Sequence, residues 1–65
     1  MKVYYKDYLI ESEYIKKFDS NIIWIYGRSV LSGNWIVINN NCKSIKEAKT
    51  YIRDNLKIVE SLRYW

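Results

Sequence analysis

The 65-residue chain contains no histidine, no proline, one cysteine and two glycines. Histidine is the side chain best suited to acid–base catalysis near neutral pH and a common zinc ligand, so its absence removes the usual catalytic and zinc-binding arrangements. The lone Cys42 can form no internal disulfide, and it has no histidine that could activate it. Two separate glycines do not make a glycine-rich phosphate loop. We therefore expect a non-enzymatic protein that uses no metal and no cofactor.

Long apolar segments are also missing. No stretch approaches the ~20 apolar residues that cross a bilayer, and the first residues lack the apolar run and small-residue cleavage site of a secretory signal. The composition is nevertheless 49% hydrophobic and 17% aromatic, which is too apolar for a disordered chain. We expect one small domain over residues 1–65, located in the cytoplasm.

The centre of the sequence predicts a β-hairpin that is apolar on both faces. Residues 22–31 and 34–40 are rich in β-branched and aromatic side chains, and Gly33 in the Ser-Gly-Asn turn can take a positive φ. Side chains alternate between the two faces of a strand. One face is then expected to pack against the rest of the domain through Ile23, Ile25, Ile36 and Ile38. The opposite side, called the open face below, is expected to carry Trp24, Tyr26, Arg28, Trp35 and Val37.

The flanking residues predict one more strand and two connections. From Val3 to about Tyr14, tyrosine and isoleucine alternate with polar residues, which is typical of a strand. Turn-forming residues over 15–21 predict the connection to the hairpin, and a helical turn over residues 11–18 is the alternative. The three asparagines at positions 39–41 predict a turn that ends the third strand.

The last third of the chain predicts one α-helix. Ser44 and Glu47 have the spacing of a capping box, with Ser44 as the N-cap and Glu47 reaching back to it. Apolar residues then recur at helical spacing: Ile45, Ala48, Ile52, Leu56, Val59 and Leu62. The expected fold class is α+β, a three-stranded antiparallel β-meander with one C-terminal α-helix packed on one face, in the order β-β-β-α.

The open face is the first candidate partner-binding surface. A chain of this length has few residues left to cover it, and contiguous exposed apolar patches mark interaction sites. Tryptophan, tyrosine and arginine are also the residue types enriched in interface hot spots. The alternatives are that residues 1–20 or the Tyr64-Trp65 tail cover this face, or that two copies of the chain pack through it as a homodimer.

The second candidate surface is a row of four cations on the predicted helix: Lys46, Lys49, Arg53 and Lys57. The net charge of +4 is mild, so a cluster of this kind is what would favour phosphate or an acidic partner. Glu47, Asp54 and Glu60 border the row, which is also typical of a solvated helix face with intrahelical pairing. A small nucleic-acid-binding protein that uses this row is the alternative function.

Three features together resemble a known group of proteins. The stretch Lys6-Asp7-Tyr8-Leu9-Ile10-Glu11 is followed by a tryptophan-containing strand and then by Ser44-Ile45-Lys46-Glu47-Ala48-Lys49-Thr50-Tyr51-Ile52. This layout resembles small uncharacterised proteins of bacteriophages and mobile elements, and more distantly the β-β-β-α arm-binding (AP2-like) domains of integrases. Arm-binding domains place a basic and polar sheet face in the DNA major groove, whereas the face expected here is aromatic, and this departure counts against reading of duplex DNA.

The resemblance to phage proteins implies an accessory protein that inhibits or modulates a protein of the bacterial host, such as a CRISPR effector or another defence component. Such a role needs no catalytic residue and suits a compact domain with one apolar surface. We therefore expect a protein-binding module whose partner is a host protein.

Overall fold

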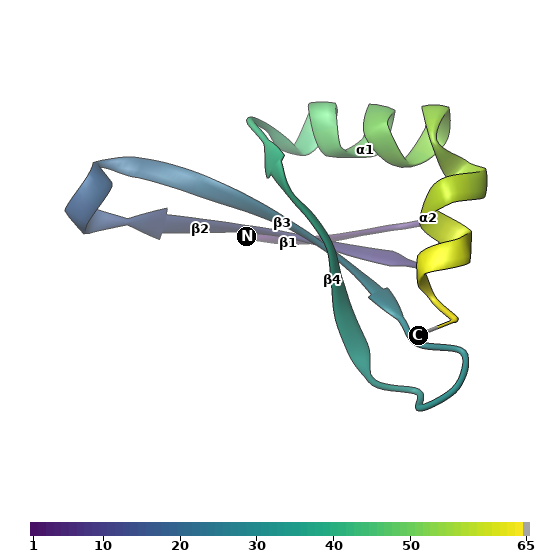
Figure 1. Cartoon of the computed structure of the whole chain (residues 1–65). Helices are drawn as coiled ribbons and strands as arrows, with labels where there is room; N and C mark the ends of the chain where they lie inside the picture. Colours follow the sequence, from purple (N-terminus) through teal and green to yellow (C-terminus); the bar gives the residue numbers. More distant parts are fainter. Residues whose placement is uncertain (65) are drawn as a thin grey trace.

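A computed structural model describes residues 1–64, which form a four-stranded antiparallel sheet with two α-helices on one side of it (Figure 1). In chain order the elements are β1 (Lys2–Tyr5), β2 (Tyr8–Ile15), the 3-10 helix η1 (Lys16–Phe18), β3 (Ser20–Arg28), β4 (Trp35–Cys42), α1 (Ile45–Asp54) and α2 (Leu56–Leu62). The strands lie in the order β1-β2-β3-β4, so neighbours in sequence are neighbours in the sheet. The class is α+β, but the predicted three strands and one helix were wrong.

The segment predicted as a single first strand is a hairpin of two strands. The chain reverses at Lys6 and Asp7, so that Tyr5 pairs with Tyr8 and Val3 pairs with Ile10. Lys6 adopts a left-handed φ of 55°, a conformation that glycine, asparagine and aspartate adopt more readily than lysine. The turn contains no glycine that would indicate it in the sequence, and the alternation of apolar residues continues through it. For this reason the sequence predicted one strand instead of two.

The next connection is shorter than predicted. β2 continues to Ile15, and the helical turn is confined to η1, because residues 11–15 pair with β3. Asp19 closes the turn with a left-handed φ of 47°, and its carboxylate accepts a hydrogen bond from the Tyr14 hydroxyl. β3 then begins at Ser20, before the predicted start of this strand.

The loop between β3 and β4 is longer than the three-residue turn that the sequence predicts. β3 ends at Arg28 and β4 begins at Trp35. Gly33 has the expected positive φ, at 77°. The backbone N–H of Val30 donates to the carbonyl of Arg63 at 2.7 Å, which ties this loop to the end of α2.

The predicted asparagine turn was also wrong, because β4 continues through all three asparagines to Cys42. Around Ile25 the pairing of β3 with β4 shifts register, which is the mark of β-bulges. The Asn39 side chain accepts a hydrogen bond from the N–H of Asn41 at 2.7 Å. The local bonding typical of asparagine thus forms within the strand and does not end it.

The predicted helix begins where expected. Ser44 is the N-cap of α1, and its Oγ accepts a hydrogen bond from the N–H of Glu47 at 3.0 Å. The Glu47 carboxylate accepts from the N–H of Lys43 at 3.1 Å rather than from that of Ser44. The first interaction satisfies a backbone N–H that a helix N-terminus leaves without a partner, and the second ties the residue before the N-cap to the first turn of the helix.

The helix does not continue to Leu62 in one piece. Asn55 leaves the helical conformation with a φ of −122°, and its side-chain amide donates to the carbonyl of Tyr51 at 3.0 Å. α2 then starts in a new direction, nearly across the axis of α1 (Figure 1). Within residues 1–64, neither helix has the length and apolar content to cross a membrane.

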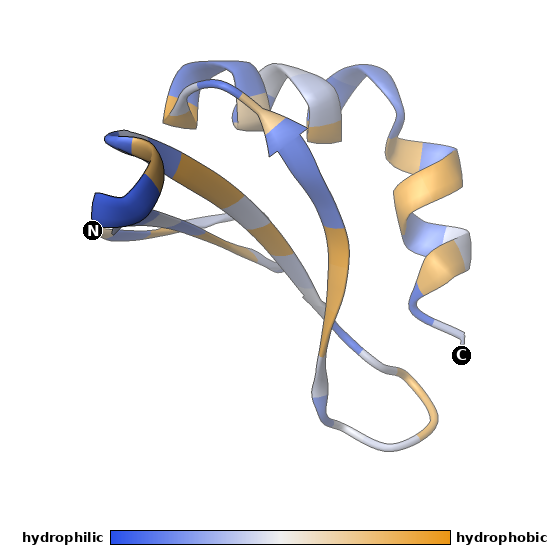
Figure 2. Ribbon diagram, turned by 60° about the vertical axis from the view of Figure 1, so that its left-hand side comes forward, coloured by the Kyte–Doolittle hydropathy of each residue, from blue (hydrophilic) through white to orange (hydrophobic). Residues whose placement is uncertain are grey.

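The core lies between the two helices and one side of the sheet. Its buried apolar side chains are Tyr8, Ile10, Ile23, Ile25, Cys42, Ala48, Ile52 and Val59, and Ile38 packs against them. The hydrophobic and less hydrophobic residues alternate along β3 in Figure 2, as expected when one of its faces is core. The turn at Asn55 brings Val59 into this core, while Leu56 and Ile58 of the same helix stay exposed.

Candidate functional site

The open face is the side of the sheet that neither helix covers. Cross-strand pairing places Tyr4, Leu9, Tyr26 and Val37 in one row across all four strands. On one side of this row Arg28 pairs with Trp35, and on the other Glu11 pairs with Trp24. The five side chains that the sequence assigned to this face, Trp24, Tyr26, Arg28, Trp35 and Val37, therefore lie together on it.

The rings of the open face are arranged in two contacts. The rings of Trp24 and Tyr26 stack with their centroids 6.3 Å apart and their planes 20° from parallel. The guanidinium of Arg28 lies over the ring of Trp35, 4.8 Å from its centroid. Both distances fall within the ranges of aromatic and cation–π attraction. These contacts fix the side chains before any partner binds, which lowers the entropy cost of binding.

Much of this surface is exposed to solvent. Tyr4 is 70% exposed, Val37 53% and Trp35 39%. The first residues of the chain extend the sheet at its edge as β1 instead of folding across this face. The side chain of Tyr64 is exposed, and Trp65, the other residue of the tail considered as a cover, lies outside the described residues.

The acidic residues of the open face lie in one half of it. Glu11 and Glu13 are on β2, opposite Trp24 and Ile22 of β3. The Lys2 ammonium lies 3.9 Å from the Glu11 carboxylate, a weak pairing at such exposure. Burial, followed by the charges of these two carboxylates, raises the pKa of the Tyr26 hydroxyl above its ordinary value.

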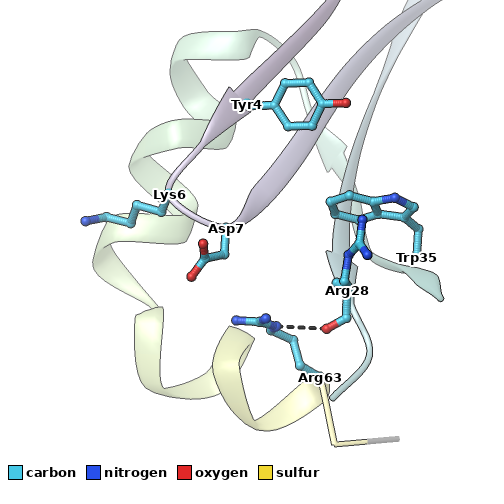
Figure 3. A pocket seen from close by; sticks show the side chains of 6 residues that line it. All are labelled: Tyr4, Lys6, Asp7, Arg28, Trp35 and Arg63. Carbon is cyan, nitrogen blue, oxygen red and sulfur yellow. Dashed lines mark hydrogen bonds between the residues drawn. The ribbon is translucent and has the colours of Figure 1, made fainter. Parts of the chain in front are cut away.

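The other end of the open face is cationic and forms a shallow pocket of about 260 Å³ (Figure 3). Six residues line it: Tyr4, Lys6, Asp7, Arg28, Trp35 and Arg63. They come from β1, the turn that follows it, the facing ends of β3 and β4, and the residue after α2. The sequence prediction identified Arg28 and Trp35 but missed the other four. It missed Tyr4, Lys6 and Asp7 because it treated β1 and β2 as one strand without a turn, and Arg63 because it did not predict the break between α1 and α2.

Arg63 holds the end of α2 against this pocket. Its Nε donates to the backbone carbonyl of Arg28 at 2.9 Å, and its Nη1 donates to the Glu60 carboxylate at 3.0 Å. Its guanidinium also lies 5.5 Å from the ring centroid of the buried Tyr8. Burial, and then the nearby Glu60 carboxylate, raise the pKa of Tyr8 to about 12, although the Arg63 cation acts in the opposite direction.

The second candidate surface is divided between the two helices. Lys46, Lys49 and Arg53 belong to α1, whereas Lys57 belongs to α2, which runs in another direction. Arg53 pairs with the adjacent Asp54 at 3.1 Å. The Lys49 ammonium lies over the ring of Tyr5, 5.9 Å from its centroid. The four cations thus do not continue along one helix axis.

Cys42 has the environment of a small core residue. Its side chain is buried, and its Sγ lies 3.8 Å from the Asn39 Oδ1. Burial, and then the charge of Glu47, raise the pKa of its thiol, which disfavours the reactive thiolate. Over residues 1–64, no three cysteine, aspartate or glutamate side chains gather closely enough to hold a metal ion.

Comparisons of the chain with protein-family models, with curated proteins and with solved structures found no match.

Proposed function

We propose that this protein is a non-enzymatic binding module that docks a protein partner on the open face of its sheet. One observation supports the proposal above all others: a cluster of aromatic side chains lies on the side of the sheet that the helices leave uncovered. Contiguous apolar surface of this kind is uncommon on monomers that bind nothing.

The residue types on the open face favour a protein as the partner. Trp35 and Tyr4 are exposed rings with a polar group at the edge, and Tyr26 between them is partly exposed. Arg28 is held in place by its contact with Trp35. Aromatic residues and arginine are the types that contribute most to binding at protein interfaces. Rigid rings also lose little conformational freedom when they are covered.

The biological setting that we propose rests on the resemblance to small phage and mobile-element proteins. In that setting the module acts in the bacterial cytoplasm and blocks or redirects a host protein. Components of host defence systems are the first class of partner to test. A small rigid domain can inhibit by occupying a surface, so the role requires no catalytic group.

Affinity capture from bacterial lysate tests the proposal. Wild-type protein should retain a partner that the Trp35→Ala variant loses, because truncating a hot-spot ring costs about 2 kcal/mol or more, roughly thirtyfold in affinity. Phe18→Ala is the matched control, since Phe18 is an exposed ring on η1 at the tip of the β2–β3 hairpin. Equal capture by the Trp35 variant and the wild type would contradict the proposed role of the open face.

A further inference from the structure

The cationic pocket at one end of the open face holds more positive than negative charge. The guanidinium groups of Arg28 and Arg63 line it together with a single carboxylate, that of Asp7. The Lys6 side chain points away from Trp35 (Figure 3), and its ammonium lies over the ring of Tyr5, 5.6 Å from the centroid. Figure 3 shows the ring of Tyr4 pointing from β1 toward Trp35, with Arg28 beside Trp35 and Asp7 on the side of Arg63. The pocket is therefore suited to an anionic group that lies between two aromatic rings.

Arg28 is the cation best placed to meet such a group. Its side chain is exposed and stacked on Trp35, whose ring keeps the guanidinium at the pocket. Arg63 is mostly occupied by the Arg28 carbonyl and by Glu60, and its side chain is only 16% exposed. Arg63 thus contributes positive charge near the pocket and fixes the position of the residues around it. Arg28 offers the planar set of donors that matches a carboxylate.

The far half of the open face determines which kind of anion fits. A nucleic-acid strand that entered the pocket and stacked on Tyr26 and Trp24 would bring phosphates close to Glu11 and Glu13. The same carboxylates influence Tyr26 strongly enough to contribute to its raised pKa. Like charges at this distance oppose a phosphate backbone, whereas a polypeptide can place an acidic side chain at one end and neutral or basic ones at the other.

We infer that the pocket receives an acidic side chain of the protein partner, with apolar side chains of the same segment lying on the neighbouring rings. This inference rests on the proposed function and adds the chemistry and orientation of the docked segment. The acidic group lies at the Arg28 end, and the segment continues over Tyr4, Tyr26 and Val37 toward Glu11. The mild positive charge of the whole chain assists the encounter.

A titration with two matched peptides, followed by backbone and indole NMR signals, tests this inference. Acetyl-Leu-Glu-Glu-Leu-amide should shift the signals of Arg28 and Trp35, and acetyl-Leu-Gln-Gln-Leu-amide should bind at least about tenfold more weakly, because charge-assisted hydrogen bonds are lost. Arg28→Gln should reduce the difference between the peptides to near zero. This variant retains the backbone carbonyl to which Arg63 donates. Arg53→Gln, which removes an equal charge from α1, should leave the difference unchanged.

Three results would overturn the inference. They are equal binding of the two peptides, shifts confined to the helices or absent throughout, and a thymidine hexanucleotide that shifts the same signals more strongly than the acidic peptide does. The proposed function is tested separately by lysate capture. If capture depends on Trp35 but not on Arg28, the open face binds a protein and only the acidic-group inference fails.

Discussion

The buried hydroxyl of Tyr8 leads to the most quantitative prediction. Tyr8 is fully buried in the core, and within residues 1–64 its hydroxyl makes no hydrogen bond of normal geometry. The Glu60 carboxylate and the Arg63 guanidinium, which pair with each other, lie close enough to influence the pKa of this hydroxyl. A buried hydroxyl without a partner costs about 1–3 kcal/mol. Tyr8→Phe keeps the ring and removes that cost, so the variant should be more stable than the wild type by about 1 kcal/mol at pH 7.

The same substitution predicts a difference in alkaline stability. The folded-state pKa of Tyr8, about 12, exceeds the ordinary value of 10.0, so folding favours the protonated hydroxyl. The stability that this preference for the protonated form gives the folded state is fully present below pH 10 and is lost as the pH rises through 12. At pH 11 the wild type should have lost about 1.4 kcal/mol through this group, and the advantage of Tyr8→Phe should have grown by that amount.

Urea unfolding followed by far-ultraviolet circular dichroism at pH 7 and pH 11 measures both effects. Tyr4→Phe is the control, because the Tyr4 ring is exposed and its hydroxyl reaches water. Lysine deprotonation affects all three proteins alike and cancels in the comparison. If Tyr8→Phe is less stable than the wild type by 1 kcal/mol or more at pH 7, the hydroxyl makes a hydrogen bond and the reasoning is refuted.

Three further predictions concern the core and the helix start. Ile52→Ala should cost about 2–4 kcal/mol in chemical unfolding because Ile52 is fully buried, whereas Ile58→Ala on the exposed side of α2 should change stability by less than about 0.5 kcal/mol; similar losses would contradict the position of the core. Ser44→Ala should cost about 1 kcal/mol, and an unchanged unfolding midpoint would show that the hydrogen bond to Glu47 contributes little. Cys42 should react with iodoacetamide far more slowly than free cysteine at pH 8 and at the ordinary rate in urea, and fast reaction of the folded protein would refute its burial.

The sequence predicted the parts of the fold that depend on local periodicity. Alternation along β3 placed Ile23 and Ile25 in the core and Trp24 and Tyr26 on the opposite side, because strand geometry fixes that choice residue by residue. The Ser44 cap and the start of α1 followed from side-chain chemistry within one turn. For the same reason, the part of the open face carried by β3 and β4 could be identified in advance.

The errors arose where a single residue redirects the chain without a change in the pattern around it. Lys6 takes a left-handed conformation that a lysine in the sequence does not predict, so the segment predicted as one strand forms two. Asn55 interrupts a helix whose apolar spacing continues beyond it. The asparagines at 39–41 made the expected local hydrogen bond but remained in the strand, because pairing with β3 extends to Cys42. The cationic pocket depends on the first of these departures, because the turn at Lys6 and Asp7 contributes to its lining.

The proposed function depends on the open face being surface in the free protein. The free energy of unfolding of Trp35→Ala, compared with that of Ile25→Ala, tests this most directly. Ile25 is fully buried and Trp35 is 39% exposed. We expect Ile25→Ala to cost about 2–5 kcal/mol, as core truncations do, and Trp35→Ala to cost less than about 1.5 kcal/mol. A loss of 3 kcal/mol or more for Trp35→Ala, the range of a buried ring, would show that Trp35 belongs to a second core and would contradict the proposed binding surface.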